Sequence, residues 1–134
     1  MASYHLSIKS GKKGTAANHA AYIAREGKHS RDAEDLDLIS TEHGNLPDWA
    51  ADNPAAFWKG ADKYERANGA TYREYELALP SELTLEQQRE LLGKFIGQNI
   101  GDKPYQLAIH EPMAALGKVA QPHAHLMVSD RKPD

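Results

Sequence analysis

Two histidines, His123 and His125, stand near the start of the apolar segment QPHAHLMVSD, residues 121–130. Successive side chains of a strand point to opposite faces, so a strand here places both imidazoles on one face. A third histidine, His110, ends the segment PYQLAIH, and twelve residues separate it from His123. If the two segments are antiparallel neighbours, the three imidazoles meet at one sheet end as a facial set of metal ligands. A same-face pair alone is more often structural or incidental, and a third histidine on the neighbouring strand makes a metal site as plausible as a structural role.

Such a site favours chemistry on a phosphodiester. Uncharged imidazole ligands leave a divalent ion its full charge, which suits an anionic substrate. The chain has no cysteine, which excludes disulfides and thiolate ligands, and no serine stands in the context of a nucleophile elbow. Tyrosines remain, and a phenolate can attack a polarised phosphodiester and be regenerated later.

Tyr22 is the tyrosine best placed for this attack. It lies in the alanine-rich segment TAANHAAYIARE, and its neighbours three and four positions away are Asn18, His19, Arg25 and Glu26. The other tyrosines fall on apolar strand faces, in an amphipathic helix or at a strand start: Tyr4, Tyr75, Tyr105, Tyr64 and Tyr72. Tyr22 therefore lies on a polar stripe of a slim helix, although a solvent-facing tyrosine without a chemical role gives the same pattern.

The other histidines have no comparable spacing, and no chemical role is expected for His5, His19, His29 and His43.

The elements that position these residues form an α+β pattern. Alternating apolar residues predict four strands, at residues 3–9, 71–80, 104–110 and 123–130. Periodicity and capping signals predict three helices, at residues 15–26, 54–67 and 84–100. We expect Thr15 to cap the first helix, a capping box from Thr84 to Gln87 to open the last, and Leu6 and Ile8 to lie on a buried strand face.

The remaining segments are irregular or short. Residues 10–14 are expected to form a loop, and residues 28–53 short helical pieces and loops. The 134 residues fit one domain, and no apolar run is long enough for a signal peptide or a membrane span. We therefore expect a cytoplasmic protein without membrane insertion.

The charge is unevenly distributed along the chain. The net charge is −3, yet residues 1–31 carry +5 (six basic residues minus Glu26), whereas residues 32–56 contain seven acidic residues and no lysine or arginine. This asymmetry permits a basic patch for phosphates, with an ordinary solvated surface as the alternative. The candidate phosphate contacts are Lys12, Lys13, Arg25, Lys28 and Arg31.

Much of the chain falls into three stretches: YHLSIKSGKKGTAANHAAYIAREGKH, YERANGATYREYELALP followed by ELTLEQQRELLGKFI, and YQLAIHEPMAALGKVAQPHAHLMVSDR. In this order they resemble the relaxase domain of the MobA/MobL family, whose members are HUH endonucleases that nick plasmid DNA at the transfer origin. The resemblance implies the HUH-nuclease fold, a central antiparallel sheet of about five strands flanked by helices. It also implies that Tyr22 attacks DNA and that His110, His123 and His125 bind one divalent ion.

The resemblance adds acidic residues to the site. The family's acidic pair falls on Glu74 and Glu76, for which we expect orientation of the ligand imidazoles rather than general-base duty. Two exposed carboxylates on a solvated face are the alternative. A further family acid falls near Asp35, where the family more usually has glutamate.

The order of the motifs agrees with a relaxase. In replication-type HUH nucleases the tyrosine follows the histidine pair, whereas in relaxases it precedes it. Only nine residues follow His125, and none is a tyrosine. Relaxases usually continue beyond the ligand strand, so residues 1–134 are expected to be a single nickase domain truncated from a longer protein. The segment 111–122 is longer than is usual, and its role stays open.

The resemblance implies strand-specific nicking and rejoining through a 5'-phosphotyrosine, for conjugative mobilization of a bacterial plasmid. The nicking step exchanges a DNA phosphodiester for a phosphotyrosine of nearly equal free energy, so the step is close to reversible. The expected ion is Mn²⁺ or Mg²⁺, with Zn²⁺, Ni²⁺ or Co²⁺ able to substitute. The expected partners of a monomeric protein are single-stranded origin DNA, accessory mobilization proteins and a type IV coupling protein.

Three other functions fit parts of the sequence. HAHLM is similar to the histidine-triad nucleotide hydrolases, but those need a further histidine where this chain has Met127. A non-catalytic single-stranded-DNA-binding module is the second alternative, and a structural metal domain without a DNA partner is the third.

Overall fold

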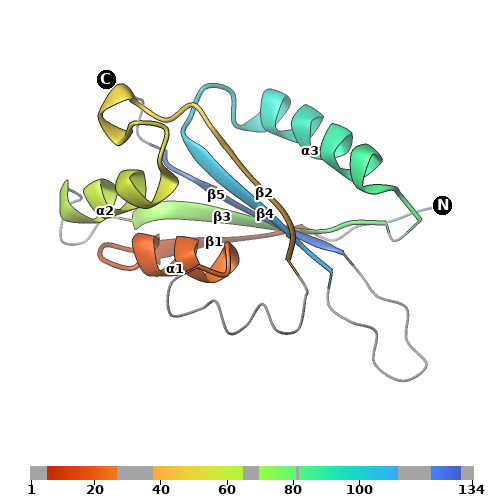
Figure 1. Ribbon diagram of the computed structural model, residues 1–134, viewed down its shortest axis with the longest axis horizontal. Helices are drawn as coiled ribbons and strands as arrows, with labels where there is room; N and C mark the ends of the chain where they lie inside the picture. Colours follow the sequence, from red (N-terminus) through yellow and green to blue (C-terminus); the bar gives the residue numbers. More distant parts are fainter. Residues whose placement is uncertain (1–5, 27–37, 65–69, 81, 112–121, 131–134) are drawn as a thin grey trace.

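A five-stranded antiparallel sheet of order β1-β3-β5-β4-β2 forms the centre of the protein (Figure 1). The computed structural model describes residues 6–26, 38–64, 70–80, 82–111 and 122–130. The elements follow one another as β1 (Leu6–Lys12), α1 (Ala16–Ile23), β2 (Leu38–Gly44), the 3₁₀ helix η2 (Asp48–Ala50), α2 (Pro54–Tyr64), β3 (Ala70–Ala78), α3 (Leu85–Asn99), β4 (Tyr105–His110) and β5 (His123–Val128). This architecture confirms the expected α+β fold.

The helices cover both faces of the sheet, with α1 and α2 on one face and α3 on the other (Figure 1). Tyr75, Leu126 and Leu107 are register partners on three adjacent strands, and they pack with Leu92 of α3. The capping box of Thr84 and Gln87 that opens α3 is present as predicted. No helix in the described parts of the chain has the length and apolar content needed to cross a membrane.

Two of the three buried residues of helix α1 are alanines. Ala16, Ala20 and Ile23 are almost fully buried. Small side chains allow the helix backbone to come near side chains of β4. The carbonyl of Ala20 accepts a hydrogen bond from Gln106 Nε2 at 3.1 Å, and the carbonyl of Ile23 accepts one from His110 Nε2 at 2.6 Å. Two polar side chains of β4 therefore attach α1 to the sheet.

The same glutamine also attaches α2. Its Oε1 accepts a hydrogen bond from the indole nitrogen of Trp58 at 3.0 Å, and both side chains are buried. Buried polar groups are tolerated when both partners are satisfied. Gln106 thus joins α2, β4 and α1 at one point.

The start of α1 is capped by a residue that is distant in sequence. Thr15 occupies the predicted N-cap position, but its side chain donates to the carbonyl of Lys12 and makes no capping bond. Instead, Asp62 of α2 accepts hydrogen bonds from the backbone N–H groups of Gly14, Ala16 and Ala17 at 2.9–3.0 Å. A carboxylate also interacts favourably with the positive end of a helix.

The structure corrects the prediction for residues 38–44, which form strand β2 rather than loops or helical pieces. This strand lies at the edge of the sheet and pairs with β4. Its sequence LISTEHG lacks strict alternation, because an edge strand exposes polar side chains on both faces.

Two predictions for β1 were also wrong. The strand continues through part of the expected loop to Lys12, with an irregularity after Gly11, where an added Cβ would lie 1.9 Å from the ring of Tyr72. Leu6 and Ile8 are 45% and 55% exposed rather than buried. In the described part of the chain, the core beneath α3 draws on β3, β4 and β5 but not on β1.

We predict that Asp62→Ala lowers the free energy of unfolding by about 2 kcal/mol, because three N–H groups at the start of α1 lose a charged acceptor. Urea unfolding measures the change, and faster amide exchange in α1 should accompany it. Asp102→Ala, at an exposed position after α3, is the control and should change little. Equal stability of both variants would show that the cap contributes nothing.

Candidate active site

The face of the sheet beneath α1 brings together five of the residues singled out in the sequence, His110, His123, His125, Glu74 and Glu76. His110 pairs with His123 across β4 and β5, and His125 pairs with Glu76 across β5 and β3. Directly opposed residues of antiparallel strands share a face. Because side chains alternate, Glu74 lies on this face too.

The His110 ring links this face to α1. Its centroid is 4.7 Å from that of the His125 ring. A carbonyl oxygen only accepts hydrogen bonds, so the 2.6 Å contact with Ile23 makes Nε2 of His110 the donor. In a neutral ring Nδ1 then carries the lone pair. A histidine whose second nitrogen donates to a carbonyl is typical of a metal ligand held in one tautomer.

Three side chains bring potential ligand atoms together: Glu74, Glu76 and His125 each offer one atom, and these atoms lie within 4.8 Å of one another. Nδ1 of His125 is 3.6 Å from Glu74 Oε1 and 3.5 Å from Glu76 Oε1. This nitrogen is buried and has no hydrogen-bond partner among the described residues. Carboxylate oxygens with an unsatisfied imidazole nitrogen suit a divalent cation, so these residues fit one.

Glu74 carries the strongest electrostatic perturbation of the site. Its side chain is almost fully buried, and Nε2 of His19 lies 2.6 Å from its Oε1. Burial by itself raises the pKa of Glu74, but His125 and His19 outweigh it and lower the pKa from 4.5 to about 2. The ammonium of Lys9, whose Nζ lies 4.0 Å from Glu74 Oε2, places a positive charge at the exposed side. Glu74 is therefore a buried carboxylate whose ionised form is favoured by its contacts with His125 and His19.

Tyr22 lies near the end of α1, one helical turn after His19. Its side chain is 41% exposed, and its ring is stacked at 6.0 Å from the ring of His19. The guanidinium of Arg25 lies 4.8 Å from the ring centroid, and its Nη1 donates to the carbonyl of Tyr22. Tyr22 therefore adjoins, through His19, the group formed by Glu74, Glu76 and His125.

Of the two competing tyrosines, Tyr4 lies outside the described residues, and the surroundings of Tyr72 suit packing better than attack. Burial, and then the charge of Glu74, raise its pKa. Its ring packs edge-on against Trp58 and is stacked with His19. A raised pKa disfavours the phenolate that an attack requires.

The sequence missed the part that His19 plays. It was expected to have no chemical role, yet its side chain contacts Glu74, Tyr22 and Tyr72. Its position three residues before Tyr22 placed it on the same helical face, which was the signal available.

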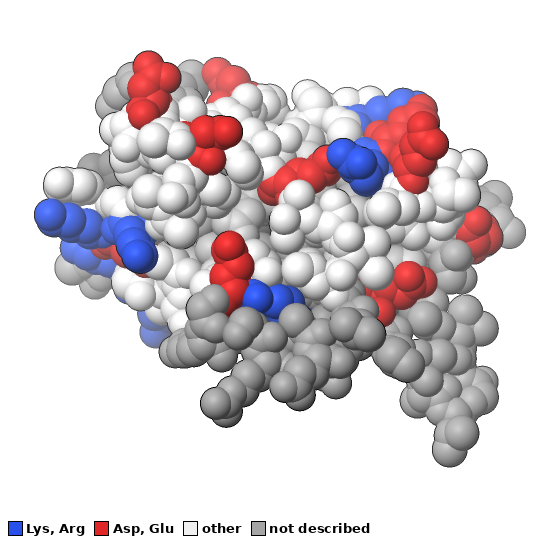
Figure 2. Space-filling view, viewed as in Figure 1, with Lys and Arg blue, Asp and Glu red and all other residues white. Residues whose placement is uncertain are grey.

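The candidate DNA contacts fall into two groups. Lys12 and Lys13 are exposed at the end of β1, and Arg25 contacts Tyr22. Lys28, Arg31 and the acidic candidate Asp35 lie outside the described residues. Figure 2 shows lysine and arginine side chains in separate groups on the face drawn, with acidic side chains between them. On this face the charge pattern favours local phosphate contacts over a broad basic surface.

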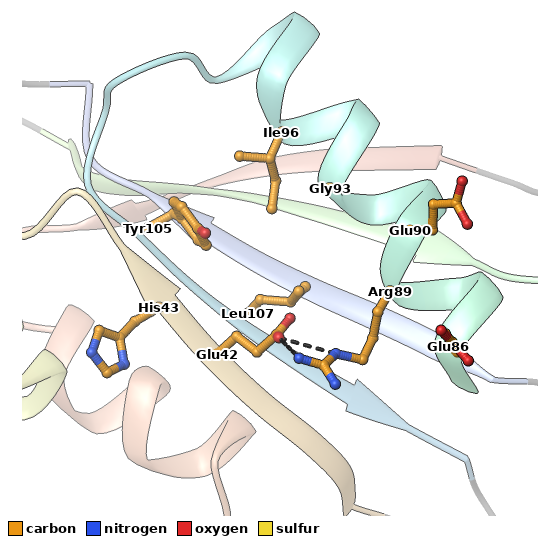
Figure 3. Close-up of a pocket in the computed structure, with 9 residues that line it drawn as sticks. All are labelled: Glu42, His43, Glu86, Arg89, Glu90, Gly93, Ile96, Tyr105 and Leu107. Atoms are coloured by element: carbon orange, nitrogen blue, oxygen red, sulfur yellow. Dashed lines mark hydrogen bonds and ion pairs between the residues drawn. The ribbon is translucent and has the colours of Figure 1, made fainter.

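A separate hollow of about 420 Å³ lies between β2, β4 and α3 (Figure 3). Leu107, Ile96 and Tyr105 form its apolar part, and an ion pair between Arg89 and Glu42 crosses it. It opens on the α3 side of the sheet, whereas His110, His123 and His125 lie on the α1 side. It is therefore distinct from the candidate active site.

The comparison with known proteins identifies the class of protein. Residues 15–134 match the model of the MobA/MobL family, and the chain belongs to this family. It is 58% identical over 135 residues to the "43 kDa relaxation protein" of Salmonella typhimurium and 43% identical over 139 residues to "Mobilization protein A" of Escherichia coli. Each match includes the whole of this chain, but only 36% and 18%, respectively, of those proteins.

The fold also matches a solved structure described as "Molecular Basis of Vancomycin Resistance Transfer in Staphylococcus aureus". The TM-score is 0.75, with 23% sequence identity over 99% of this chain and 73% of the other. At this identity the likeness establishes the shared fold.

We predict that Glu74→Gln removes most of the acid sensitivity of the fold between pH 4.5 and 2. The unfolded carboxyl binds its proton near 4.5 and the folded one near 2, so acid favours the unfolded state in this window. The wild-type advantage is complete above pH 4.5, on the order of 3 kcal/mol, and disappears towards pH 2. Urea unfolding across this range measures it, with the exposed Glu82→Gln as control. Parallel stability curves for wild type and Glu74→Gln would contradict the assignment.

Proposed function

We propose that this chain is the nicking domain of a plasmid mobilization relaxase, which cleaves and rejoins one strand of DNA at a transfer origin. The observation that carries the proposal is the position of Tyr22: its ring adjoins His19, which bonds to the Glu74 carboxylate beside His125. The names of the relatives, a relaxation protein and a mobilization protein, support the same role.

In the proposed reaction, the phenolic oxygen of Tyr22 attacks the scissile phosphorus. A bond forms between this oxygen and phosphorus, the bond to the 3' oxygen breaks, and the products are a 5'-phosphotyrosine and a 3'-hydroxyl. The phenolic proton is lost and the leaving 3' oxygen takes one up. Because one phosphodiester replaces another, attack by the 3'-hydroxyl of a DNA end regenerates Tyr22 and rejoins the strand.

A divalent ion, Mn²⁺ or Mg²⁺, supplies positive charge that favours the phenolate and neutralises charge on the phosphate when it is bound. The family resemblance assigns its ligands to His110, His123 and His125, whereas the potential ligand atoms that lie within 4.8 Å of one another in the described structure belong to Glu74, Glu76 and His125. We propose that the histidines hold the ion, with the two carboxylates orienting His125 through Nδ1.

The DNA is proposed to approach over α1 and the end of β1, where Lys12, Lys13 and Arg25 can contact phosphates. Lys28 and Arg31 extend the candidate contacts, and Asp35 is a further acidic candidate for the site. Accessory mobilization proteins and a type IV coupling protein are proposed partners in the cytoplasm.

We predict that Tyr22→Phe abolishes the covalent adduct with single-stranded transfer-origin DNA in the presence of Mn²⁺. The substitution removes only the phenolic oxygen, so DNA affinity should change less than 2-fold. Denaturing gels detect the adduct and fluorescence anisotropy measures the affinity. Tyr64→Phe, on the exposed side of α2, is the control and should react normally. An adduct that survives in Tyr22→Phe but vanishes in Tyr72→Phe would show that Tyr72, and not Tyr22, is the nucleophile. Cleavage without any adduct would contradict the relaxase proposal.

We predict that His125→Ala weakens Mn²⁺ binding about 10- to 100-fold, measured by calorimetry without DNA. His125 belongs to both ligand sets, so the loss is expected whichever set holds the ion. His123→Ala and Glu76→Gln then separate the two sets. With histidine ligands, His123→Ala has the larger effect; a larger effect of Glu76→Gln would assign the ion to the Glu74–Glu76–His125 group. An unchanged Mn²⁺ affinity in His125→Ala would show that the ion does not bind at this site.

A further inference from the structure

His19 makes three contacts that connect the sheet to the proposed nucleophile. Its Nε2 lies 2.6 Å from Oε1 of Glu74. Its ring is stacked with the ring of Tyr72, with centroids 5.2 Å apart and planes within 6° of parallel. It is also stacked against the ring of Tyr22, with centroids 6.0 Å apart and planes at 29°. One imidazole therefore contacts two residues of β3 and the tyrosine of α1.

The β3 side of this arrangement is rigid. Glu74 is 1% exposed, so its carboxylate has a fixed position. The Tyr72 ring is packed against Trp58 and lies over Gly11 of β1. A hydrogen bond and a parallel stack hold His19 at two points, and its ring cannot rotate without losing at least one of them.

The Tyr22 side is less constrained by burial. Its side chain is 41% exposed near the helix end, and exposed side chains change rotamer readily. An in-line attack on phosphorus needs the phenolic oxygen in one orientation, and loss of orientation costs rate rather than affinity. A rigid ring against Tyr22 restricts the rotamers that the tyrosine can adopt.

We propose that His19 is a positioning residue for Tyr22: held by Glu74 and Tyr72, it keeps the tyrosine ring in the orientation from which it attacks DNA. This inference rests on the proposed function for its consequence, but the contact itself is independent of DNA. Glu74 therefore acts on the nucleophile through His19, in addition to its contact with His125.

Two substitutions of His19 separate its hydrogen bond to Glu74 from its ring contact with Tyr22. His19→Gln keeps an N–H donor that can reach Glu74 but removes the ring that stacks on Tyr22. His19→Phe keeps a ring but leaves the buried carboxylate without its hydrogen bond, so it should be the less stable variant. His43→Ala is a matched control, because His43 is similarly half-buried and lies 2.8 Å from a carboxylate oxygen of Asp52 on another part of the fold.

The first measurement uses the protein without DNA. In NMR spectra with labelled tyrosine, the Tyr22 ring signals are identified by their loss in Tyr22→Phe. We expect His19→Gln to move these signals towards the values of an unstructured tyrosine, because the ring current of the imidazole is removed, while His43→Ala leaves them in place. Unmoved Tyr22 signals in His19→Gln would overturn the proposal.

The second measurement is single-turnover adduct formation with transfer-origin single strands and Mn²⁺. We expect His19→Gln to be about 10- to 100-fold slower than wild type, with DNA affinity within 2-fold and near-normal stability. If His19 only donated a hydrogen bond to Glu74, His19→Gln would form the adduct at the wild-type rate and would have wild-type stability. That result would show the proposal to be wrong. Failure of the relaxase proposal is recognised separately, because Tyr22→Phe would then react like wild type.

Discussion

The buried carboxylate of Glu74 is the constraint on which the candidate active site depends. An ionised carboxylate in a protein interior is tolerated only when charged or hydrogen-bonding groups surround it. Glu74 is 1% exposed, and its nearest partners come from two other elements, His19 of α1 and His125 of β5. Burial of one charge therefore requires α1 and β5 to lie against β3. The same contacts set the orientation of an imidazole on each side.

Helix α1 is attached to the rest of the protein along its whole length. Asp62 holds its first N–H groups, Gln106 the carbonyl of Ala20, and His110 the carbonyl of Ile23, which directly follows Tyr22. His110 also adjoins the His125 ring. A displacement of α1 would consequently disturb His110, so the position of the tyrosine and the geometry of the histidines are physically coupled.

The parts of the structure that the sequence predicted are those with local patterns. Alternation and capping residues located β3, β4, β5 and α3, and the spacing of His123 and His125 placed them on one face. Strand β2 was missed because an edge strand needs no alternation. The exposure of Leu6 was missed because the local sequence does not indicate which strands α3 covers.

The missed features of the site share one cause, which is distance along the chain. His19 meets Glu74 across 55 residues, and Asp62 reaches Ala16 across 46. Such pairs depend on the packing of α1 and α2 on the sheet, and no spacing rule within a single element predicts them. The resemblance to the MobA/MobL family supplied Glu74 as a candidate, but its partner on α1 became evident only from the fold.

The most direct test of Tyr22 as the nucleophile is to identify the residue that carries the DNA. The protein is incubated with a panel of transfer-origin single strands and Mn²⁺, the adduct is digested with protease and nuclease, and the modified peptide is sequenced by mass spectrometry. We expect a nucleotide 5'-phosphate on Tyr22, in a peptide from α1. A phosphate on Tyr72 or any other residue, or cleaved DNA with no modified peptide, would contradict it.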